Sequence, residues 1–175
     1  MKRALRNSVI WFCGLFYEDF KNFDYQVKSL LVITFMQKII GKNRNVRWPV
    51  HPTTIIKAPE KLKTSNRPTG ISPRMYIDAR NGIEIENNVY MGPGIHIISQ
   101  NHDLNDYTKY LWNNPIIIRK NTWIGANAII LSGVELGGHT VVGAGSVVTK
   151  SFAEGNQVIA GNPARVIKKL APYKR

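Results

Sequence analysis

Residues 121–149 read NTWIGANAIILSGVELGGHTVVGAGSVVT, and a branched aliphatic residue recurs at every sixth position. An α-helix repeats every 3.6 residues, so a period of six excludes an amphipathic helix. Six residues suffice for one short strand and a corner, because side chains alternate across a strand with a period of two. The series begins just upstream of this stretch and comprises Ile118, Ile124, Ile130, Leu136, Val142 and Val148.

A second series with the same period lies upstream of the first. Three units of six residues would close a triangular turn of about 18 residues that stacks on the next turn. An ordinary sheet also tolerates a spacing of six, but it does not explain the recurrent Gly125, Gly137 and Gly143, which suit tight corners. The sequence therefore predicts a mainly β protein, a parallel β-helix of hexapeptide repeats. The upstream series comprises Ile71, Ile77, Ile83, Val89 and Ile95.

The two series are out of phase, because 23 residues separate Ile95 from Ile118. This break predicts a loop inserted at about residues 99–115. A second boundary lies near Trp48-Pro49, where proline ends a helical pattern. We expect an N-terminal helical segment at residues 1–47 and the β-helix domain at residues 48–175.

The N-terminal segment is both basic and apolar. Residues 1–47 contain nine Lys and Arg against three Asp and Glu, and the apolar runs at 9–16 and 30–40 are shorter than the roughly 20 residues that span a bilayer. The second run predicts a helix that stops at Gly41. Two interpretations stay open: the helices pack on the coil or a partner subunit, or they make a peripheral contact with an anionic membrane. We expect a cytoplasmic protein, with the inner membrane face as the alternative site.

The overall charge restricts the partners. A net charge of +13 attracts nucleic acid, acidic lipid headgroups, anionic polysaccharide or a phosphorylated cofactor. The sequence contains no recognised nucleic-acid motif, so we expect no nucleic-acid partner. The single Cys13 cannot form an internal disulfide, which fits a reducing compartment.

Several motifs within the repeat point to a family. WIGAN at 123–127, VGAGSVVTK at 142–150 and AGNPARVI at 160–167 resemble the hexapeptide-repeat acyltransferases. The likeness is greatest to the galactoside, maltose and polysaccharide O-acetyltransferase branch, and it covers about residues 71–170. It implies a left-handed coil, acetyl-CoA as co-substrate without a metal, and a homotrimer with active sites between subunits.

The resemblance places the catalytic histidine at the start of the loop that leaves the coil, and His102 stands there. Imidazole is a suitable base near neutral pH, so His102 is predicted to take the proton of an acceptor hydroxyl during direct attack on the thioester. Asp103 is a candidate to orient it, although a backbone carbonyl would serve as well. The backbone N–H of Gly125 or Ala126 is expected to stabilise the oxyanion.

The same resemblance places coenzyme A along the coil. Small side chains would let it approach the backbone, and basic side chains would neutralise its phosphates. These predicted contacts are Trp123, Gly125, Ala126, Ala144, Thr149, Lys150, Arg165 and Lys168. For the acceptor, aromatic side chains of the loop could stack on a sugar ring, and two polar residues precede His102 on earlier turns. These predicted contacts are Ser72, Asp78, Tyr107 and Trp112.

The predicted function is O-acetyl transfer from acetyl-CoA to a sugar hydroxyl, in surface polysaccharide or glycan biosynthesis. One alternative is a metal-dependent hydratase like the γ-type carbonic anhydrases, which needs three histidines on zinc. The candidates for it are His51, His96, His102 and His139. Another alternative is a non-catalytic coil that acts as a scaffold. The identity of the acceptor, and O- against N-acetylation, stay open.

Overall fold

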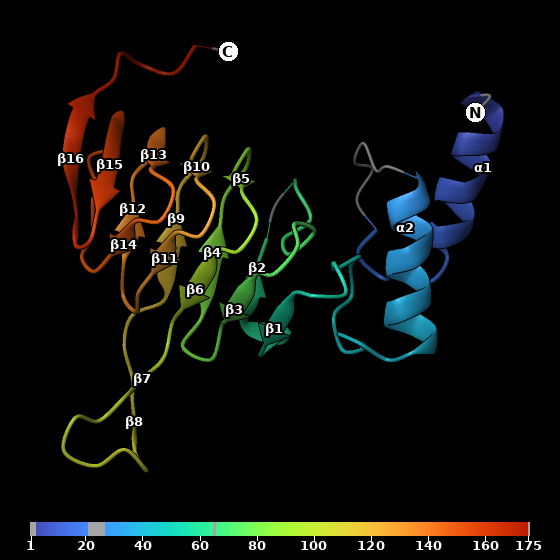
Figure 1. Ribbon diagram of the computed structural model, residues 1–175, viewed down its shortest axis with the longest axis horizontal. Helices are drawn as coiled ribbons and strands as arrows, with labels where there is room; N and C mark the ends of the chain where they lie inside the picture. Colours follow the sequence, from blue (N-terminus) through green and yellow to red (C-terminus); the bar gives the residue numbers. More distant parts are fainter. Residues whose placement is uncertain (1–2, 21–26, 65, 175) are drawn as a thin grey trace.

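The computed structural model describes residues 3–20, 27–64 and 66–174 of the chain. Helices α1 (Arg3–Gly14) and α2 (Val27–Thr34) stand together at one end of a stack of short strands (Figure 1). The π-helical turn η1 (Phe35–Ile39) extends α2, and Gly41 follows with a φ of 89°, which favours glycine. Within the described residues, no helix has the length and apolarity needed to cross a membrane.

Three parallel sheets form the three sides of the coil, and the chain visits them in a fixed order. The first side contains β1 (Ile55–Lys57), β3 (Tyr76–Asp78), β6 (His96–Ile98), β11 (Ile129–Ile130) and β14 (Val147–Val148). The second side contains β2 (Leu62–Lys63), β4 (Ile83–Ile85), β9 (Ile116–Ile118) and β12 (Glu135–Leu136), with the 3-10 turn η2 (Pro59–Lys61) before β2. The third side contains β5 (Tyr90–Met91), β10 (Trp123–Ile124), β13 (Thr140–Val142), β15 (Gln157–Gly161) and β16 (Ala164–Lys169).

Each strand pairs in parallel with the equivalent strand of the next turn, as in the register of Ile77 with Ile97 on the first side. The last strand, β16, turns back and runs antiparallel to β15. The predicted mainly β coil with N-terminal helices is therefore confirmed.

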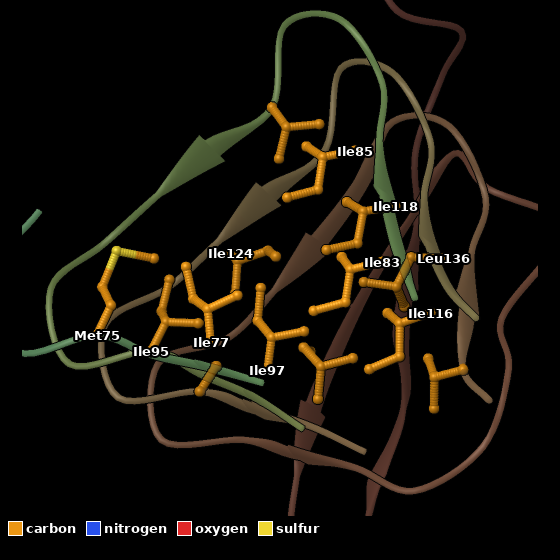
Figure 2. Packing of buried hydrophobic residues seen from close by; sticks show 14 of the residues in the cluster. Met75, Ile77, Ile83, Ile85, Ile95, Ile97, Ile116, Ile118, Ile124 and Leu136 are labelled. Carbon is orange, nitrogen blue, oxygen red and sulfur yellow. The ribbon is translucent and has the colours of Figure 1, made fainter. Parts of the chain in front are cut away.

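The interior of the coil is a stack of aliphatic side chains, around which the chain winds (Figure 2). Ten of the eleven residues predicted by the period of six are at most 5% exposed. Burial of each such side chain stabilises the fold by about 1.5–3 kcal/mol. The exception is Ile71, which is partly buried and packs against Cys13 and Leu30 beneath the helices. Ile71, the first residue of the predicted upstream series, thus packs between the helices and the coil.

Glycines occupy corners because successive turns approach too closely for a side chain. A Cβ on Gly125 would lie 2.6 Å from the backbone nitrogen of Ala144, and a Cβ on Gly92 would lie 2.7 Å from that of Ala126. Neither glycine has a positive φ, so space and not backbone conformation selects glycine at these two corners.

Gln37 joins the helical segment to the coil. It is 1% exposed, and its Nε2 donates to the carbonyls of Asn43, Val46 and Trp48 at 3.0–3.1 Å. Its Oε1 accepts the N–H of Val50 at 3.1 Å. One buried amide thus satisfies four backbone groups where the chain leaves η1 for the first turn of the coil.

Candidate active site

The insertion between β6 and β9 leaves the coil at the corner between the first and second sides. Its core is an antiparallel hairpin of β7 (Asn101–His102) and β8 (Tyr110–Leu111), which projects from the coil (Figure 1). His102 pairs in register with Tyr110 across the hairpin. The repeat phase therefore breaks where the chain makes this excursion.

The surroundings of His102 fix its tautomer. Its Nδ1 lies 2.6 Å from the backbone carbonyl oxygen of Tyr107. A carbonyl can only accept, so Nδ1 carries the proton and the neutral ring keeps its lone pair on Nε2. The ring is tilted against that of Tyr110, with centroids 4.6 Å apart, and the residue is exposed. His102 is thus held at one nitrogen and open to solvent on its other edge.

Asp103 does not reach the imidazole. Its carboxylate accepts the N–H of Asn105 at 2.7 Å, and its own N–H donates to the carbonyl of Lys109 at 3.0 Å. Asp103 therefore shapes the hairpin turn. The backbone carbonyl that the sequence left as the alternative orienting group is the one that contacts His102.

The turn below the loop holds the root of the hairpin. Asn81 Nδ2 donates to the carbonyls of Ser99 and Leu111, both at 3.0 Å, and thereby joins the two ends of the excursion. The Ser99 hydroxyl accepts the N–H of Asn81, and Ser132 of the next turn donates to the Ser99 carbonyl at 2.6 Å. Asn81 Oδ1 is buried and has no hydrogen-bond partner among the described residues. These contacts fix the direction in which the hairpin leaves the coil.

Asp78 is not available to an acceptor. It is 1% exposed, and both carboxylate oxygens bind the Arg80 guanidinium at 2.6–3.1 Å. Burial disfavours the charged form, but the hydrogen bonds and charge of Arg80 outweigh it, so the pKa of Asp78 lies below its usual value. The Arg80 guanidinium also lies 5.2 Å from the Tyr110 ring centroid. The predicted acceptor contact is instead an ion pair that supports the ring beside His102.

A groove of about 400 Å³ lies between this corner and the loop. Lys61, Arg80, Asn81 and Trp112 are among the residues that line it. Trp112 is 78% exposed, with the Lys61 ammonium 5.4 Å from its ring centroid. Tyr107 is also exposed, and its carbonyl binds His102. The predicted aromatic contacts are therefore open to solvent on the loop.

Other predicted residues lie away from His102 within one chain. Ser72 lies at the corner between the third and first sides, where its hydroxyl donates to the Met91 carbonyl at 2.9 Å. Trp123 is exposed on the third side, in register with Tyr90 and Val141. In a triangular coil the third side is opposite the corner that carries His102. One chain therefore does not bring Trp123 and His102 together.

The predicted coenzyme A contacts occupy two corners and one side. Gly125, Ala126 and Ala144 follow β10 and β13 at the corner between the third and first sides. The Gly125 N–H donates to the Val142 carbonyl at 2.9 Å, so this amide is already used within the coil. Thr149, Lys150, Arg165 and Lys168 are exposed. The first two follow β14 at the corner that carries the loop two turns earlier, and the others lie on β16.

The four histidines do not gather into a metal site within one chain. His51 contacts Thr53, and His139 contacts Asn156 and Tyr173. Across residues 3–20, 27–64 and 66–174, no three His, Cys, Asp or Glu side chains come together as metal ligands would. The ligand set that the hydratase alternative requires is not formed in this part of the chain.

Sequence reasoning missed Arg80 and Asn81, although a signal for them exists. Asp78 and Ile98 are in register on the first side. The residues that follow Asp78 must therefore lie below those that follow Ile98, where the loop begins. The residues one turn of the coil before the loop could therefore have been predicted to contact the base of the loop, and these residues are Arg80 and Asn81.

Comparison with known proteins agrees with this fold. Residues 115–150 match the family model described as bacterial transferase hexapeptide (six repeats). A galactoside O-acetyltransferase of Lactococcus lactis subsp. lactis is 37% identical over 91 residues, which cover 50% of this chain and 44% of that protein. The chain thus spans about half the length of the curated relatives it matches.

Two solved structures share the fold across more of the chain. A maltose O-acetyltransferase from Clostridium difficile 630 has a TM-score of 0.52 at 23% identity, covering 97% of this chain and 90% of that one. A mutant of the N-acyltransferase AntD from Bacillus cereus, in complex with dTDP and coenzyme A, has a TM-score of 0.56 at 22% identity, covering 73% and 82%. With the family match at residues 115–150, these likenesses confirm the predicted resemblance of the chain to the hexapeptide-repeat acyltransferases, on the side of the galactoside and maltose acetyltransferases.

Proposed function

We propose that the protein transfers an acetyl group from acetyl-CoA to a hydroxyl of a saccharide, with His102 as the general base. The observation that carries this proposal is the 2.6 Å contact between His102 Nδ1 and the Tyr107 carbonyl. It leaves the basic nitrogen of an exposed imidazole on a loop of a hexapeptide coil, where a bound hydroxyl can reach it.

The proposed chemistry needs no covalent enzyme intermediate. His102 Nε2 accepts the proton of the acceptor hydroxyl as that oxygen attacks the thioester carbonyl. The imidazolium, stabilised by its hydrogen bond to the Tyr107 carbonyl, then returns the proton to the departing thiolate. Because the Gly125 N–H is used within the coil, Ala126 is the better of the two predicted amides for the oxyanion.

The co-substrate would bind along the coil beyond the loop. Exposed Lys150, Arg165 and Lys168 supply positive charge where the adenosine phosphates are expected. Small Ala126 and Ala144 leave the corner backbone accessible to the pantetheine amides. Trp123 and Thr149 remain proposed contacts on the same part of the coil.

We propose that the site is completed by a second copy of the chain, in a trimer. His102 projects at one corner, whereas Trp123 lies on the opposite side of its own coil. A neighbour related by a three-fold axis could present its third side to the hairpin. His102 would then face Trp123 of the neighbour.

The proposed acceptor is a sugar or glycan. The groove between the coil and Trp112 offers an exposed indole, and sugar rings stack on such faces. A role in polysaccharide or glycan biosynthesis follows as the proposed setting.

Release of free thiol from acetyl-CoA tests the proposal, against a panel of sugars, amino sugars and oligosaccharides. Wild type should show acceptor-dependent release, and His102→Ala should lose at least about 100-fold while still binding CoA. His139→Asn is the matched control, because His139 contacts Asn156 and Tyr173 away from the loop. Equal release by His102→Ala and wild type would remove His102 from the mechanism. Failure to bind CoA would favour the scaffold alternative.

A further inference from the structure

The helical end of the molecule exposes an apolar surface that the coil does not use. Ten large apolar side chains of residues 5–40 are each at least 43% exposed. Large apolar side chains exposed in such numbers on two neighbouring helices favour an interaction surface. The side chains are Leu5, Trp11, Phe12, Leu15, Phe16, Leu31, Val32, Phe35, Ile39 and Ile40. We call them the outer apolar residues.

These side chains follow from the helical period on both elements. On α1, Val9 and Cys13 pack with Leu30, whereas Leu5, Trp11 and Phe12 are each more than half exposed. On α2 and η1, the inward positions are buried, and the outer apolar residues recur at intervals of three and four. Both helical elements therefore carry large apolar side chains that the fold leaves exposed.

All charged side chains on α1, α2 and η1 are positive. None of α1, α2 and η1 contains an acidic residue. Lys28 is exposed in the first turn of α2, before the outer apolar residues of α2 and η1 begin. Lys42 and Arg44 are exposed just after those residues end. The nearest carboxylate of the chain after α1, that of Glu18, is paired with Arg47 at 3.3 Å. Exposed apolar side chains with cations on either side complement a partner surface that has an apolar interior and an anionic outer layer.

We propose that the two helices dock this protein on an anionic lipid bilayer, with the outer apolar residues inserted among the acyl chains. Aromatic and aliphatic side chains with Lys and Arg at the margins are typical of helices that lie in a membrane interface. Lys28 and Lys42 then contact lipid phosphates, and Trp11 lies at the boundary between headgroups and acyl chains. A second copy of the chain is the competing occupant, but it would bring Lys28 and Lys42 of two copies together on helices that contain no acidic residue.

Vesicle co-sedimentation of the full chain tests the proposal. The protein should bind vesicles of phosphatidylcholine with phosphatidylglycerol, bind vesicles of phosphatidylcholine alone much less, and lose binding as salt is added. Ile39→Ser should weaken binding about tenfold. Ile167→Ser is the matched control, because Ile167 on β16 is 64% exposed and Ile39 is 65% exposed. Lys28→Gln should weaken binding about fivefold, and Lys174→Gln should not.

Tryptophan fluorescence gives an independent readout. Emission should shift to the blue when anionic vesicles are added, and Trp11→Phe should abolish most of the shift, since Trp11 is 67% exposed on α1. Circular dichroism of each variant checks that it is folded.

Three results would overturn the proposal. Equal binding to both kinds of vesicle would exclude anionic lipid as the partner. Equal binding by Ile39→Ser and Ile167→Ser would exclude the outer apolar residues. Absence of vesicle binding, with a smaller particle mass for Ile39→Ser in light scattering, would assign this face to a contact between copies. No acetyl donor is present, so these results are independent of whether the protein transfers acetyl groups.

Discussion

Arg80→Met should destabilise the protein in a way that depends on pH. The substitution removes the guanidinium but keeps an aliphatic stem, and it leaves the Asp78 carboxylate 1% exposed without its bidentate partner. Loss of one partner from a buried ion pair costs about 3–5 kcal/mol. Arg80 is 34% exposed and Lys57 still faces Asp78 across the sheet, so we expect about 2–3 kcal/mol near neutral pH.

The sign of the pH dependence follows from the direction of the pKa shift. In the wild type the pKa of Asp78 is lowered, so the contribution of the pair is present above the unfolded pKa and is lost as pH falls through the folded pKa. In Arg80→Met, burial still raises the pKa of Asp78, and only the backbone N–H of residue 80 and the charge of Lys57 lower it, so this pKa is higher than in the wild type. The stability gap between the two proteins should therefore shrink as pH falls through the lowered pKa of Asp78 and widen toward neutral pH.

Thermal unfolding by circular dichroism at a series of pH values measures this gap. For a chain of this size, 2–3 kcal/mol corresponds to a Tm lowered by about 5–10 °C near pH 7. The double variant Asp78→Asn/Arg80→Met removes the buried charge, so it should recover about half of the loss and show no widening gap. A gap that is constant across pH, or a double variant as unstable as Arg80→Met, would refute the role assigned to the pair.

Three further substitutions test the close approach at the corner of Gly125, the contacts of Gln37 between helices and coil, and the contacts of Asn81 at the base of the hairpin. Gly125→Ala places a Cβ 2.6 Å from the Ala144 nitrogen, so it should cost about 1–3 kcal/mol in denaturant unfolding, whereas an unaltered midpoint would contradict the close approach. Gln37→Leu leaves the carbonyls of Val46 and Trp48 and the N–H of Val50 without their partner, so it should cost at least about 2 kcal/mol and speed hydrogen exchange at residues 43–50. Asn81→Ala frees the Leu111 carbonyl, so proteolysis within residues 101–111 should accelerate with little change in global Tm, and acetyl transfer should fall about tenfold.

The coil was predictable from sequence because its interior demands the same kind of side chain every six residues. In the downstream series Ile118 and Leu136 are in register one coil apart, as the period requires. In the upstream part Ile77 pairs with Ile97 and not with Ile95, although Ile95 is also buried. The phase break located the excursion for the same reason, since a stacked coil cannot absorb 23 residues between inward positions without leaving its path. Features that repeat along the chain can therefore be predicted from the sequence alone.

The contacts of individual polar side chains were less accessible, because they depend on how the loop folds back. Asp103 is adjacent to His102 in sequence, yet the hairpin turns its carboxylate to the Asn105 N–H and brings the Tyr107 carbonyl to the imidazole. Asp78 was predicted to contact the acceptor because it precedes His102 on an earlier turn of the coil. Its burial depends on Arg80 curling back two residues, which no periodicity encodes.

The repeat also determines on which side of the coil each predicted site residue lies, and this matters for how copies of the chain could assemble. His102 follows β6 at the corner between the first and second sides, and Trp123 opens β10 on the third side of the same turn. No rotation of the hairpin changes this, because parallel pairing fixes Trp123 between Tyr90 and Val141. If both residues serve one reaction, two chains must meet at each site. A stable monomer with full acetyltransferase activity would therefore exclude Trp123 from the site of His102, whatever the role of either residue alone.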